Sequence, residues 1–104
     1  MKLFDITDMQ AHGYDQRSRN VFYETPGFKM RVIDLGPGEA IPQCEMSSHV
    51  IFVCAEGEAF VTVDGKEVSL TPAQGLATEP TTLSMKSDTG AKLLGIQIAS
   101  AENV

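Results

Sequence analysis

The sequence lacks several features that would place it in a broad class of protein. It has no tryptophan, two cysteines and two histidines among 104 residues. Its eight Lys and Arg residues are scattered, and fourteen Asp and Glu residues outnumber them, which gives a net charge of −6. Nucleic-acid binding needs clustered basic residues to neutralise phosphates. We therefore expect no nucleic-acid partner.

Long apolar runs are also absent. No stretch approaches the roughly 20 apolar residues of a transmembrane helix, and the opening residues, MKLFDITDMQ, hold no apolar segment of a signal peptide. These absences predict a cytoplasmic protein with no membrane partner. In a reducing cytoplasm Cys44 and Cys54 are expected to be free thiols, although a disulfide between them stays open at this stage.

The chain does have many short extended segments, divided by Pro and Gly. One turn of helix is expected over residues 8–12, with Thr7 as its N-cap, and Asp64-Gly65 predicts a type I′ hairpin. In the segment FKMRVIDL, the residues Phe28, Met30 and Val32 alternate with Lys29 and Arg31, which indicates a half-buried strand. Strands are expected over residues 19–24, 28–35, 50–55, 59–63, 66–70, 76–78, 81–86 and 92–99, with a frayed end over 101–104. So many short strands with little or no helix predict an all-β sandwich or jelly-roll barrel.

One segment resembles a known family motif. Residues 38–57 read GEAIPQCEMSSHVIFVCAEG, which resembles the first cupin motif, G-x5-H-x-H-x3-E-x6-G, with Gly38 and Gly57 in the glycine positions. The string FVCAEGEAFVTVDGKEVSLTPAQG also resembles the typical run of the small single-domain cupins, and a weaker second motif surrounds Pro80. The resemblance covers about residues 28–99. It implies one domain over 1–104, a double-stranded β-helix (the cupin-type jelly-roll barrel) over 19–100, and an N-terminal arm over 1–18.

The resemblance does not extend to the metal ligands. In cupins, three histidines and a glutamate converge inside the barrel and hold Fe, Mn, Ni, Cu or Zn. The matching positions of this chain hold Cys44, Met46, Val50 and Met85. Valine has no donor atom, and a thioether is a poor ligand for these divalent cations. The match therefore implies a degenerate metal site, and no cofactor is expected.

Three sulfur side chains at former ligand positions allow two interpretations. Cys44, Met46 and Met85 would suit Cu(I) as a soft ligand set, or they would simply fill the interior, because Met and Cys pack well in irregular spaces. Cys44 would act as a nucleophile only with a lowered pKa and a nearby base.

The alternation of side chains along a strand predicts which residues line the barrel interior. Ser48, Phe52 and Cys54 share the parity of Val50. The predicted pocket lining is Cys44, Met46, Val50, Phe52 and Met85, with Leu83 and Phe60 as further candidates. His49 would point to the opposite face unless a bulge turns it inward as an accessory residue. Gln43, Glu45, Ser48 and His49 are the polar groups considered for orienting a ligand.

The charged residues near the first strands, Arg17, Arg19, Glu24 and Arg31, are interpreted as solvated and structural, and His12 as a surface residue. In small cupins the first strands often pair across a homodimer, which also covers exposed sheet edges. A homodimer is therefore expected.

These observations favour a barrel that binds or senses a small apolar molecule without catalysis, and they single out no catalytic residue. The alternative is a metal-dependent cupin enzyme, of the oxygenase or isomerase type, which would need His49, Cys44 or Glu45 to reach the pocket. A third possibility is a filled barrel that serves only as an interaction domain, because small barrels either pack their interior or hold one ligand.

Overall fold

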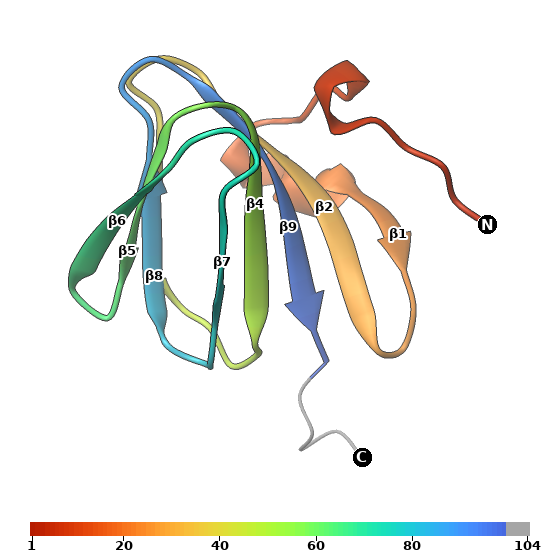
Figure 1. Ribbon diagram of the computed structural model, residues 1–104. Coiled ribbons are helices and arrows are strands. Elements are labelled where there is room, and N and C mark those ends of the chain that lie inside the picture. The colour runs from red at the N-terminus through yellow and green to blue at the C-terminus, as the bar shows by residue number, and fades with distance from the viewer. Residues whose placement is uncertain (100–104) are drawn as a thin grey trace.

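Two antiparallel sheets face each other in the computed structural model, which describes residues 1–99 (Figure 1). One sheet has five strands in the order β1-β2-β9-β4-β7, and the other has four in the order β3-β8-β5-β6. The strands are β1 Val21–Glu24, β2 Phe28–Leu35, β3 Ala40–Glu45, β4 Val50–Gly57, β5 Ala59–Val63, β6 Lys66–Leu70, β7 Gly75–Thr78, β8 Thr82–Lys86 and β9 Ala91–Ile98. The all-β prediction is confirmed. The frayed end expected over 101–104 lies outside the described residues.

Strand β3 is the one strand that the sequence pattern did not predict. Its sequence, AIPQCE, holds Pro42 and two polar residues, so no alternation marks it. It pairs with β8 through Ile41↔Met85 and Cys44↔Leu83, with a bulge between the two pairs. The extra residue in the bulge places Ile41 and Cys44 on the same face of the sheet.

Within residues 1–99 the helical content is two short 3₁₀ segments, and their positions differ from the expected turn over 8–12. Segment η1 spans Ile6–Asp8 and is capped by Asp5, whose side chain accepts from the Thr7 backbone N–H at 3.0 Å. Segment η2 spans Tyr14–Asn20, so β1 begins two residues later than predicted. None of the helical segments in residues 1–99 is long and apolar enough to cross a membrane.

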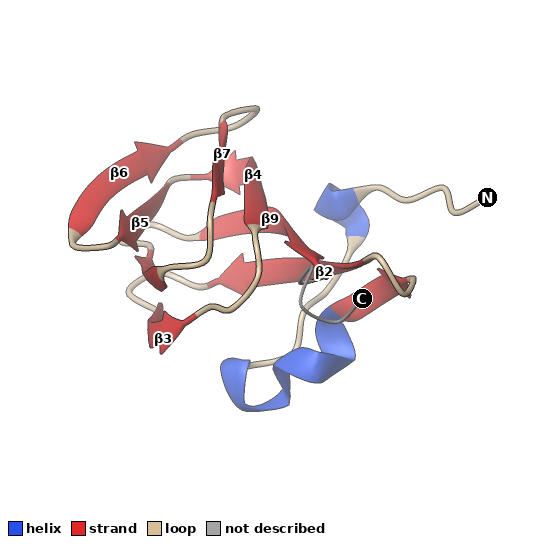
Figure 2. Cartoon of the chain, turned by 90° about the horizontal axis from the view of Figure 1, so that it is seen from below, coloured by secondary structure: helices blue, strands red, loops and turns tan. Residues whose placement is uncertain are grey.

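The two 3₁₀ segments lie at different faces of the five-stranded sheet. Segment η1 contacts β9 and β4, and Lys92 of β9 holds its flanks by donating to the backbone oxygens of Thr7 and Met9 at 3.1 and 2.7 Å. Segment η2 contacts β1 and β2 and is visible in Figure 2 as the blue segment on the side where β2 faces β3. The arm therefore closes the side of the barrel that the strands leave open.

The core lies between the two sheets. In β4 the alternate residues that were predicted to face the interior do face it. Val50 and Cys54 are 3% and 1% exposed and belong to the core, and Phe52 packs against it. Strand β2 is half-buried as expected, but it has buried apolar residues on both of its faces. Leu35 belongs to the core and Ile33 packs against it, so Arg31, which shares their parity, also faces the interior. Val32, on the other face, is buried but stands outside the core cluster.

Two turns depend on positive backbone φ angles. Gly57, the second glycine of the motif, has φ +74°, and a Cβ there would lie 2.0 Å from the carbonyl oxygen of Gly90. Only glycine fits so close an approach. Asp64 and Gly65 have φ of 49° and 82°, as a type I′ hairpin between β5 and β6 requires.

Candidate functional site

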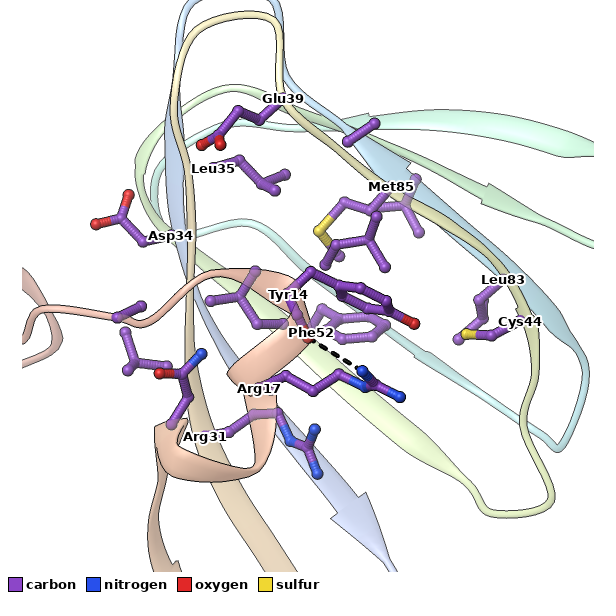
Figure 3. Close-up of a pocket in the computed structure, with 18 of the residues that line it drawn as sticks. Tyr14, Arg17, Arg31, Asp34, Leu35, Glu39, Cys44, Phe52, Leu83 and Met85 are labelled. Carbon is purple, nitrogen blue, oxygen red and sulfur yellow. Dashed lines mark hydrogen bonds between the residues drawn. The ribbon is translucent and has the colours of Figure 1, made fainter.

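A cavity of about 510 Å³ lies between the sheets on the side of β2, β3 and η2. Figure 3 shows its lining residues converging from these elements and from β4 and β8. The strands supply mainly apolar side chains, whereas the arm and one end of β2 supply polar ones. The interior is therefore not filled throughout by its own side chains.

The structure brings the five sequence-predicted pocket residues together. Cys44 comes from β3, Met46 follows it, Val50 and Phe52 come from β4, and Met85 comes from β8. Leu83, which precedes Met85 by two residues, also lines the cavity. The bulge in β3 carries Cys44 to this face, whereas the regular pairing of β4 with β9 sets Val50 and Phe52 there by alternation alone.

Several other candidates lie elsewhere. His49 immediately precedes β4, is exposed, and lines a groove on the outer face with Ile51 and Ile98. Gln43 and Glu45 are exposed and do not line the cavity. Ser48 is buried outside the cavity lining, and Cys54 lies in the packed core.

Phe60 also differs from expectation. Ala59 and Val61, its neighbours in β5, are each 0% exposed and occupy the interior face. Phe60 therefore points outward, where its ring lies 6.0 Å from the Lys86 ammonium. The sequence segment AFVTV is apolar on both faces, so its pattern alone could not show which face is buried.

The residues at the former ligand positions do not fit a divalent first-row metal. The sulfurs of Cys44 and Met46 lie close together, with 3.8 Å between Sγ and Sδ, and Val50 supplies no donor. Within residues 1–99 no three His, Cys, Asp or Glu side chains gather closely enough to hold a metal ion. Imidazole and carboxylate donors, which Fe(II), Mn(II) and Zn(II) prefer, are missing from the set.

The two cysteines are separate free thiols. Cys44 is partly buried in the cavity wall, and its recorded hydrogen bond goes to the Met46 thioether. Cys54 is buried, and this burial raises the pKa of its thiol, while a hydrogen bond to the Glu56 carbonyl acts in the opposite direction. Neither arrangement pairs a thiol with a base, as an activated nucleophile requires.

The polar residues of the cavity are ones that the sequence pattern did not identify. Arg31 projects from β2 and donates from Nη2 to Oε1 of Gln97 at 3.3 Å. Arg17 projects from η2, with its guanidinium 4.2 Å from the centre of the Tyr14 ring, and donates from Nη1 to the Tyr14 carbonyl at 3.0 Å. All four residues line the cavity. Arg31 is partly buried, although its place in an alternating strand suggested a solvated side chain. Arg17 is exposed as expected, but it also lines the cavity because η2 lies across the opening.

Burial changes the pKa of one of the two guanidiniums, that of Arg31. Desolvation lowers the pKa of Arg31, the charge of Arg17 lowers it further, and Glu24 raises it. Arginine nevertheless remains protonated at neutral pH, because its usual pKa lies far above that range. The cavity wall therefore carries two positive charges.

No family model matches the sequence, and no curated protein matches it. Solved structures do match the fold. A cupin superfamily protein from Desulfitobacterium hafniense matches with a TM-score of 0.72 at 17% identity, over 77% of this chain and 74% of that one. A cupin protein from Bacteroides fragilis matches with a TM-score of 0.65 at 22% identity, over 72% and 68%. Salicylate 1,2-dioxygenase from Pseudoaminobacter salicylatoxidans matches with a TM-score of 0.67 at 16% identity, over 70% of this chain but 21% of that one. At such identities the likeness concerns the fold alone.

Proposed function

The chain has the cupin fold, and from this premise we propose that it binds a small, mainly apolar molecule inside the barrel and that binding, not catalysis, is its role. The observation that carries the proposal is the cavity of about 510 Å³. Ligand pockets of roughly 300–1,000 Å³ with apolar walls and a few polar groups are the usual form of small-molecule sites. Phe52, Met46 and Met85 give such walls, and the two methionines can adjust to the shape of a ligand.

The donor chemistry supports binding over a metal-dependent reaction. An oxygenase or isomerase of the usual cupin kind needs imidazole or carboxylate ligands, and the two residues nearest in sequence that could supply them, Glu45 and His49, do not line the cavity. An acid–base reaction would need a titratable group within hydrogen-bond reach of the substrate. The thiol of Cys44 has a thioether as its neighbour. His12, Asp34 and Glu39 also line the cavity, but their side chains form no hydrogen-bonded acid–base pair with one another or with Cys44.

Binding of a neutral apolar probe tests the proposal. We expect N-phenyl-1-naphthylamine to gain fluorescence with the purified protein and to saturate at one probe per chain. Cys44→Trp would fill the cavity and abolish this binding. Gln43→Trp is the matched control, because Gln43 is the exposed neighbour on the same strand and does not line the cavity. Equal binding by the wild type and both variants would contradict the proposal.

A second candidate function is Cu(I) binding through Cys44, Met46 and Met85. The observation in its favour is the 3.8 Å between the Cys44 and Met46 sulfurs in a cavity that Met85 also lines. A thiolate and two thioethers are suitable ligands for this soft ion. Competition with a chromophoric Cu(I) chelator under reducing conditions would show one ion per chain, lost in Cys44→Ser. Binding that survives Cys44→Ser would remove this candidate.

The homodimer and the cytoplasmic location stay predictions. Strands β1 and β7 form the edges of the five-stranded sheet, and exposed edges are commonly covered by pairing. Light scattering on the purified protein is the direct measurement of the dimer. A monomer across the micromolar range would contradict it.

A further inference from the structure

The two guanidiniums in the cavity wall have no carboxylate partner among residues 1–99. The ion pairs of this part of the chain are Lys29–Glu24 and Lys86–Glu67, each at 3.8 Å. The acidic side chains of the cavity lining are Asp34 and Glu39. Figure 3 shows Glu39 at the opposite end of the cavity and Asp34 pointing away from both guanidiniums. Arg17 and Arg31 are therefore two cations of one cavity wall, close enough for the charge of Arg17 to act on Arg31, and neither has an ion-pair partner in this part of the chain.

Each guanidinium is held in place by neighbouring groups. Arg17 stacks on the Tyr14 ring and is anchored to the carbonyl of that residue. Arg31 is partly buried and is anchored to Gln97 on the adjacent strand. One hydrogen bond on each leaves other N–H groups of the guanidinium available, since arginine carries five donors. Two guanidinium groups held in fixed orientations are suited to binding a planar oxyanion such as a carboxylate.

The cavity wall beside Arg31 is apolar. Gly95 of β9 pairs with Arg31 on one side and with Phe52 on the other. A Cβ on Gly95 would lie 3.2 Å from Cδ1 of Ile33, 3.4 Å from Cγ of Arg31 and 3.5 Å from the Phe52 ring, so the missing side chain lets these three side chains pack together over the strand. Arg31 and Phe52 thus lie side by side in the cavity wall, and one molecule could contact Phe52 with its apolar body and Arg31 with a group at its end.

We infer that the ligand of the cavity is a small organic acid, with its carboxylate between Arg17 and Arg31 and its apolar body toward Phe52 and Met85. This inference rests on the proposed binding function and specifies its ligand class. The carboxylate would relieve the repulsion between the two guanidiniums and accept charge-assisted hydrogen bonds from both. A neutral molecule of the same shape would gain the apolar contacts only.

A matched pair of ligands separates the two contributions. 1-Naphthoate and 1-naphthamide have nearly the same shape and differ in charge, and calorimetric titration would give the affinity of each. We expect the acid to bind at least about tenfold more tightly, because hydrogen bonds to charged groups are worth about that much or more. Arg31→Gln and Arg17→Gln should each reduce the preference for the acid and leave the affinity for the amide nearly unchanged.

Arg19→Gln is the control for charge alone. Arg19 lies in η2 like Arg17, is exposed, donates to Gln16 and does not line the cavity, so its variant should bind both ligands as the wild type does. Arg17 is also exposed, so its replacement tests the inference without a risk to folding. Equal affinities for acid and amide, or a preference that survives both Arg17→Gln and Arg31→Gln, would overturn the inference while the binding function stands. Binding of neither ligand would overturn both.

Discussion

The two halves of the barrel interior differ, although the same two sheets enclose them. In the packed half, Cys54, Ala59 and Leu93 are each 0–1% exposed and do not line the cavity. In the hollow half, Met46 and Phe52 stay partly exposed, and the wall facing them is the short segment η2 instead of a strand. Strand pairing therefore secures the first half, whereas the second depends on how the N-terminal arm is attached. The difference shows that a cavity can be made by leaving one side of a jelly roll to a non-sheet segment.

The largest effect is expected at the turn that closes the packed half. Gly57→Ala would place a methyl group against the Gly90 carbonyl at a positive φ. We expect a loss of about 3 kcal/mol or more in the free energy of unfolding, measured by urea denaturation. Gly38→Ala is the control, because Gly38 has φ +79° but nothing within 4 Å. Its cost should be about 1 kcal/mol. Similar losses in the two variants would show that the close approach at Gly57 does not restrict the turn.

The second prediction compares side-chain truncations in the packed half and the hollow half of the interior. Leu93→Ala removes a side chain that is 0% exposed and should cost about 2–5 kcal/mol in unfolding free energy. Met46 borders an existing cavity, so Met46→Ala creates little new empty volume. It should lower the free energy of unfolding by about 1 kcal/mol. The same denaturation measurement covers both variants. Comparable costs would mean that the second half is packed as tightly as the first.

A smaller effect on stability than that of Leu93→Ala is expected where the arm is attached. Asn20 is 8% exposed and makes two hydrogen bonds with the His12 backbone, accepting from its N–H at 2.7 Å and donating to its carbonyl at 3.0 Å. Asn20→Ala should cost about 1–2 kcal/mol and accelerate amide hydrogen exchange in residues 1–20 but not in β5 or β6.

Ser18→Ala is the control for this variant, because Ser18 is an exposed residue of the same segment. It should leave hydrogen exchange unchanged throughout. Faster exchange spread evenly over the barrel in Asn20→Ala would show that the arm and the strands open as one unit. The arm would then not be the separately attached wall that the comparison assumes.

Local patterns were enough to predict much of the fold. The β-branched run VIFVCA and the Asp64-Gly65 turn produce β4 and the β5–β6 hairpin as expected, because short-range periodicity and turn chemistry govern both. Strand β3 was missed because Pro42 and its polar neighbours show no alternation, and its pairing with β8 is a long-range contact. The positions Val50 and Phe52 in the cavity wall followed from parity alone.

The sequence by itself determined the class of fold and the loss of the usual metal donors, since both follow from residue identity and spacing. Only the tertiary structure decided which face of β2 looks inward, and with it the place of Arg31. A strand with side chains suited to burial on both faces does not reveal which layer covers each face. Likewise, Arg17 reaches the cavity because η2 packs across the side between β2 and β3, a long-range arrangement that no local periodicity encodes.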